Sequence, residues 1–135
     1  MRAAVDVHEL DALIEEVGKR GFMWHHFRVD RHGPDVLAGV FQWDGCADVV
    51  VLTDDEGSHA YRTPTNQATD IFDPSQVYWW YGGSVEVGMV WVLRALLLLP
   101  QPDTPDGLLP LRPAPPETGV PGDRIPVRLR KRPAC

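Results

Sequence analysis

Apolar residues in the first half of the chain recur first at helical and then at strand-like spacing. Between residues 5 and 20 they recur every three or four positions opposite an acidic face, which predicts an amphipathic helix. Four strand-like runs follow, at residues 22–30, 36–43, 48–53 and 58–63. The first alternates in the manner of a half-buried strand, and the third contains three consecutive valines. Asp44-Gly45, between the second and third runs, is typical of a two-residue hairpin turn. The pattern predicts a four-stranded antiparallel meander after an N-terminal helix.

The most apolar stretch runs from Asp73 to Leu99. Asp73 followed by Pro74 is typical of a helix start, and Gly82-Gly83 divides the stretch into two pieces. We therefore expect a broken helix on the sheet, with an aromatic piece over residues 74–81 and an apolar piece over residues 85–99. Together these elements predict the α+β class and a single domain over residues 1–100.

The chain after residue 99 differs in composition, because ten of the 13 prolines lie there. Proline removes a backbone donor and fixes φ, so we expect an irregular C-terminal extension over residues 101–135. Residues 112–135 carry a net charge of +4, which leaves −10 for the rest of a chain whose total is −6. The basic tail either contacts the acidic body or meets an acidic partner. Its candidate contact residues are Arg124, Arg128, Arg130 and Arg132.

Several features bear on where the protein works. Glu86 and Arg94 interrupt the long apolar stretch, and each charge at a membrane centre costs about 2.5–3.5 kcal/mol, so we expect no membrane insertion. The N-terminus is too acidic for a signal peptide. Two cysteines do not make a disulfide framework, and we expect a cytoplasmic protein with reduced thiols. Arginine outnumbers lysine 11 to 2, as is common in GC-rich bacterial genomes.

Candidate chemistry is sparse. His26 and His59 could meet across the sheet, but no histidine spacing matches a metal motif, so we expect no metal and no cofactor. Cys46 lies beside two aspartates, which raise a thiol pKa and argue against a cysteine nucleophile. Gly82-Gly83 lacks the features of a phosphate-binding loop. The sequence thus favours a non-enzymatic protein.

The aromatic piece suggests a binding role. Its consecutive side chains are those of Tyr78, Trp79, Trp80 and Tyr81. Four neighbours on a helix point in all directions, so one sheet face cannot cover them all. Because large exposed apolar patches mark binding surfaces, we expect a protein–protein interaction or accessory module. Residues 74–81 and the C-terminal extension would bind another protein or a second copy, as in a homodimer.

Two alternatives remain open. The first is a small-molecule binding or enzymatic domain with a pocket between the sheet and the broken helix. Its lining would be Trp24, Trp43, Tyr61 and Trp79, with His26, His59 and Arg62 as polar groups. The second is weak nucleic-acid association through the basic tail, which the acidic body makes the less favoured possibility.

Overall fold

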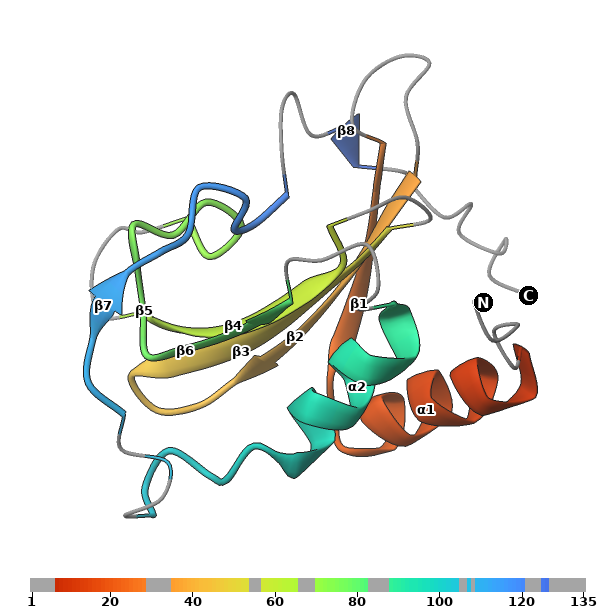
Figure 1. Cartoon of the computed structure of the whole chain (residues 1–135), viewed down its shortest axis with the longest axis horizontal. Helices are drawn as coiled ribbons and strands as arrows, with labels where there is room; N and C mark the ends of the chain where they lie inside the picture. Colours follow the sequence, from red (N-terminus) through yellow and green to blue (C-terminus); the bar gives the residue numbers. More distant parts are fainter. Residues whose placement is uncertain are drawn as a thin grey trace, which may run out of the picture.

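The computed structural model describes residues 7–28, 35–53, 57–65, 70–82, 88–104, 107, 109–120 and 125–126. It has the α+β fold predicted from the sequence, with an N-terminal helix, an antiparallel sheet and a second helix (Figure 1). The elements in chain order are α1 (Val7–Lys19), β1 (Met23–Arg28), β2 (Asp35–Gln42), β3 (Cys46–Thr53), β4 (His59–Pro64), β5 (Gln76–Val77), β6 (Trp79–Gly82), α2 (Met89–Leu98), β7 (Arg112–Pro113) and β8 (Ile125–Pro126).

The main sheet has the strand order β6-β4-β3-β2-β1-β8, and every neighbouring pair is antiparallel. Strands β1 to β4 form the predicted meander, with boundaries within two residues of those expected. The Asp44-Gly45 turn joins β2 to β3, and the Trp43 N–H donates to the Cys46 carbonyl over 2.8 Å across it. Gly45 has a φ of 86°, a left-handed conformation that glycine adopts without steric cost.

The prediction of a helix over residues 74–81 is wrong. These residues form β5 and β6, and β6 pairs with β4 so that Trp80 lies opposite Tyr61. Tryptophan and tyrosine favour strands, and pairing with β4 supplies backbone partners that a short isolated helix would lack. The apolar piece is a helix as expected, although the described helix α2 is shorter than residues 85–99. Residues 83–87, including the predicted break at Gly83, lie outside the described part.

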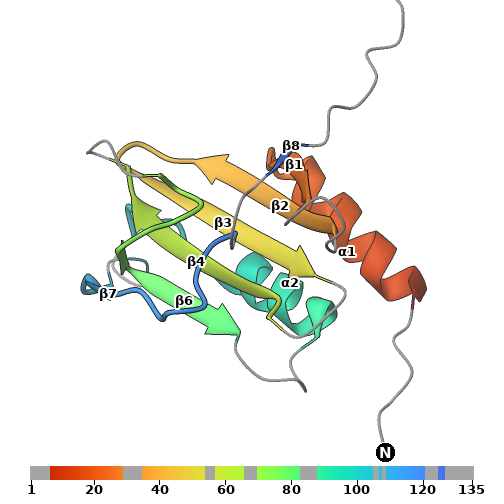
Figure 2. The same ribbon diagram turned by 90° about the horizontal axis from the view of Figure 1, so that it is seen from above.

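The two helices lie on the same face of the sheet (Figure 2). Their apolar sides pack on that face in a core centred on Val17, Val50, Leu52, Val92 and Leu93. The salt bridge between Arg94 of α2 and Glu9 of α1 joins the helices to each other. Neither helix in the described ranges is long and apolar enough to cross a membrane.

The opposite face of the sheet is covered by irregular chain rather than by helices. A second core there contains Val49 and Tyr61 from the sheet together with Phe72, Val77 and Val120. Part of the C-terminal extension reaches this face, because β7 pairs with β5 and the Val120 N–H donates to the Phe72 carbonyl. The candidate tail residues Arg124, Arg128, Arg130 and Arg132 lie outside the described residues.

Candidate functional site

The aromatic residues of β6 alternate across the sheet. Trp79 and Tyr81 pack with the helix-side core, and their rings stack with centroids 6.4 Å apart. Trp80 packs on the opposite core and stacks on His59 with ring centroids 6.1 Å apart. Each of the three is half-buried by this chain. Their alternation follows from strand geometry, in which successive side chains point to opposite faces.

Strand β6 ends the main sheet on one side. It pairs with β4 on its inner side, and no described strand pairs with its outer side. Helix α2, which contacts β6, also carries two exposed apolar residues: Trp91 is 55% exposed and Leu98 is 81% exposed. Trp91 lies against the Arg94 guanidinium, 5.1 Å from the ring centroid. An open strand edge and exposed apolar side chains therefore occur on neighbouring elements.

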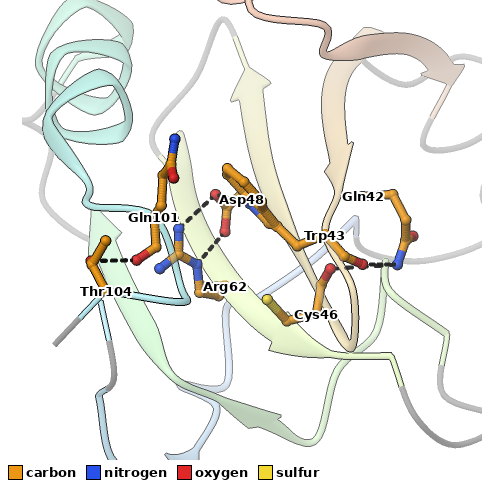
Figure 3. A network of polar contacts seen from close by, with 7 residues as sticks. All are labelled: Gln42, Trp43, Cys46, Asp48, Arg62, Gln101 and Thr104. Atoms are coloured by element: carbon orange, nitrogen blue, oxygen red, sulfur yellow. Dashed lines mark hydrogen bonds and ion pairs between the residues drawn. The ribbon is translucent and has the colours of Figure 1, made fainter. Parts of the chain in front are cut away.

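A buried ion pair joins β3 to β4. Asp48 and Arg62 are directly opposite in the antiparallel register, and the guanidinium donates Nε to Oδ1 over 2.6 Å and Nη2 to Oδ2 over 2.9 Å (Figure 3). The Arg62 side chain is only 1% exposed. This bidentate geometry is the strongest form of an arginine–carboxylate interaction. Removing either partner would leave the other charged and buried.

Trp43 extends the network by donating its indole Nε1–H to Asp48 Oδ2 over 2.8 Å. The Arg62 guanidinium carbon lies 6.0 Å from the centroid of the same ring. Cys46 lies nearby and is buried. Burial raises the pKa of its thiol, the Asp48 charge raises it further, and Arg62 acts in the opposite direction. The thiol is therefore neutral at ordinary pH and a poor nucleophile.

His59 is buried on the other face with both ring nitrogens engaged. Nδ1 lies 2.6 Å from the Gly57 carbonyl, and Nε2 accepts the Gly119 N–H over 2.8 Å. Because Nε2 must accept, the neutral tautomer carries its proton on Nδ1 and donates it to Gly57. Burial lowers the pKa of His59, although the Gly57 carbonyl and Glu117 act in the opposite direction. His59 is thus a neutral anchor for the C-terminal extension.

The residues proposed for a single pocket are divided between two faces. Trp24 and Trp79 belong to the helix-side core, whereas Tyr61 and His59 lie on the opposite face. His26 is on β1, separated from β4 by two strands, and its Nε2 lies 3.3 Å from Asp35. On the helix side Trp43 and Arg62 meet through Asp48, and on the opposite face His59 and Tyr61 stack with ring centroids 5.7 Å apart. No group of three histidine, cysteine or acidic residues within the described ranges could hold a metal ion.

The partners that position these residues are not evident from the sequence. In the sequence Asp48 stands out only as a neighbour of Cys46 and as a possible companion of His26 and His59, and Gly119 does not stand out at all. Asp48 could have been found from the hairpin register, because a charged residue within an otherwise apolar strand needs a partner on the next strand. Nothing in the local sequence marks Gly119, since its partner is 60 residues away. Comparisons with protein-family models, with curated proteins and with solved structures give no match to this chain.

Proposed function

We propose that this protein is a binding module that receives a segment of a partner protein at the outer edge of β6. The observation that carries the proposal is the open edge itself, with three consecutive half-buried aromatic residues and no described strand beyond it. An exposed edge offers unpaired backbone donors and acceptors to an added strand. Trp79, Trp80 and Tyr81 would supply contact area on both faces of that strand.

The described part of the extension supports placing the surface on β6. Arg112 and Pro113 pair with β5, whereas Gly119 and Val120 donate to His59 and to the Phe72 carbonyl. Residues 112–120 therefore cover this chain's own sheet. They are therefore engaged within the molecule. We accordingly assign the binding role to β6 rather than to the extension.

The charge distribution favours a basic partner over a second copy. Five of the six lysine and arginine side chains in the described part form ion pairs with carboxylates of this chain. Asp44, Asp73 and Asp103 are exposed and have no ion pair with described residues. Two copies would each carry −6 and would repel, whereas a basic protein would be attracted.

Site-specific photo-crosslinking tests the proposal. A benzophenone amino acid replaces Tyr81 on β6 or, as the matched control, the exposed apolar residue Met23 on β1. We expect a discrete heterologous adduct from position 81 in a lysate of the native cells. Excess unlabelled protein should compete it away, and high salt should weaken it. Equal adducts from both positions, or none from position 81, would contradict the proposal. An adduct of twice the chain mass would show that the partner is a second copy of this chain rather than a basic protein.

A further inference from the structure

Residues 112–120, which we call the strap, cross the face of the sheet opposite the helices (Figure 2). The strap begins at β7, which pairs with β5, and Ala114 donates its N–H to the Ser75 carbonyl over 3.0 Å. Residues 112–118 are exposed or half-buried, whereas Gly119 and Val120 are buried against β4 and Phe72. The fully buried attachment of the strap is therefore at its end.

The middle of the strap has few N–H groups to offer the sheet. Pro115 and Pro116 have none. The Thr118 N–H is used within the strap, because it donates to the Pro115 carbonyl over 3.0 Å. The Thr118 hydroxyl is buried with no hydrogen-bond partner among the described groups, and a buried hydroxyl without a partner disfavours the closed arrangement. Retention of the strap on the sheet therefore depends on the bonds of Gly119 and Val120.

His59 can hold Gly119 only in its neutral form. Its Nδ1 lies against the Gly57 carbonyl, and its Nε2 accepts the Gly119 N–H. A proton on Nε2 would put two N–H groups against each other, and Nδ1 cannot take over because it is already engaged. A single protonation therefore removes the hydrogen bond that ties the strap to β4.

The groups around His59 determine how readily it takes up that proton. The Tyr61 and Trp80 rings stack on the imidazole with ring centroids 5.7 and 6.1 Å away. Burial lowers the pKa of His59, whereas the Gly57 carbonyl and the Glu117 carboxylate of the strap act in the opposite direction. Release of the strap would expose the imidazole to water, where it binds a proton more readily. Proton binding therefore favours the released arrangement over the closed one.

We propose that the strap is an acid-released cover, in which protonation of His59 frees the end of the strap and uncovers the core around Tyr61 and Trp80. The helix-side core stays folded, because it is a separate cluster around Val50 and Leu93. This release is a property of the chain alone and does not depend on a partner at β6. Since Trp80 belongs to β6, release would enlarge the apolar surface beside the open edge.

Amide exchange of the full chain tests the release. NMR follows each amide between about pH 8 and about pH 5, with rates corrected for the intrinsic pH dependence of exchange. We expect protection of Gly119 and Val120 to fall by up to about tenfold per pH unit below pH 6.5, as one proton requires. Val50 is the control, because β3 is paired on both sides, and its protection should change by less than about twofold. Constant protection of Gly119 and Val120, or an equal fall at Val50, would overturn the proposal.

Two further measurements tie the release to His59. Its ring-nitrogen NMR shifts at about pH 8 should show the proton on Nδ1, and a proton on Nε2 would overturn the proposal. His59→Gln should abolish the pH dependence of Gly119 protection, whereas His26→Gln on β1 should preserve it. Near-ultraviolet circular dichroism checks that each variant is folded. Persistent pH dependence in folded His59→Gln, or its loss in His26→Gln, would also overturn the proposal. The ring shifts need no variant, so they decide the question if His59→Gln fails to fold.

Discussion

His59 and Gly119 lie 60 residues apart and meet through a buried hydrogen bond in which the Gly119 N–H donates to His59 Nε2 over 2.8 Å. The next residue, Val120, is buried in the same core as Tyr61 and donates its N–H to the Phe72 carbonyl. The hydrogen bond to His59 ties Gly119, and with it this part of the extension, to β4. The stability of that face should therefore depend on the protonation state of His59.

Acidification should destabilise the protein through His59. Burial lowers its native pKa below the ordinary value of 6.5, so the unfolded chain binds a proton more readily than the native one. The contribution to stability is complete above pH 6.5 and decreases as pH falls from 6.5 towards the native pKa. Protonation of His59 would also put a hydrogen on Nε2. This nitrogen could then no longer accept the hydrogen bond from the Gly119 N–H. Urea unfolding from about pH 8 to about pH 5 measures the effect.

The variant His59→Gln isolates this contribution, because it leaves every other histidine unchanged. We expect it to cost about 1–3 kcal/mol near pH 8, where the histidine hydrogen bonds are intact. The difference between variant and wild type should shrink towards pH 5. A difference that stays constant across the range would show that His59 does not couple pH to stability.

Substitution of Gly119 by alanine should disrupt the same contact sterically. A Cβ there would lie 2.1 Å from the Phe72 carbonyl oxygen, and φ is 96°. Gly45 is the matched control, because its φ is 86° and a Cβ would meet open space. Gly45→Ala should cost about 1–2 kcal/mol from backbone conformation alone, and Gly119→Ala should cost clearly more. If thermal unfolding shows equal losses of stability in Gly119→Ala and Gly45→Ala, the contact with Phe72 is easily relieved.

The buried ion pair should show strong non-additivity. Arg62→Met leaves the Asp48 carboxylate buried without its partner and should lower the free energy of unfolding by about 3–5 kcal/mol. The double variant with Asp48→Leu removes both charges and should recover most of that loss. Its residual cost comes from the Trp43 indole N–H, which loses its acceptor. If the stability losses of the two single variants add up to the loss of the double variant in a mutant cycle, this account is contradicted.

The buried and exposed sides of helix α2 should contribute very differently to stability. Leu93 is completely buried, so Leu93→Ala should cost about 2–5 kcal/mol in chemical denaturation. Trp91 is more than half exposed, and Trp91→Ser should change stability by no more than about 0.5 kcal/mol. A large loss in Trp91→Ser would assign Trp91 to the core rather than to the exposed side of α2.

The sequence was most informative where one local pattern decides the structure. Strand-like runs separated by short turns, Asp44-Gly45 among them, predicted the meander, and helical spacing predicted α1. The pattern failed at Trp79–Gly82, because consecutive aromatic residues have no period and the choice of strand depended on pairing with β4. Distant pairs such as His59 with Gly119 leave no local signal. The residues expected to line one pocket are divided between two faces, because Tyr61 and Arg62 are adjacent in the chain and point to opposite sides of the sheet.

Hydrogen–deuterium exchange of the purified complex tests the central claim most directly. The heterologous partner captured from position 81 is purified and mixed with the unmodified chain at low ionic strength. The account predicts slowed amide exchange at residues 79–82 on binding, with little change in β2 and β3, which are already paired on both sides. Protection confined to α1 or β1, with residues 79–82 exchanging as in the free protein, would contradict the assignment of binding to the edge of β6.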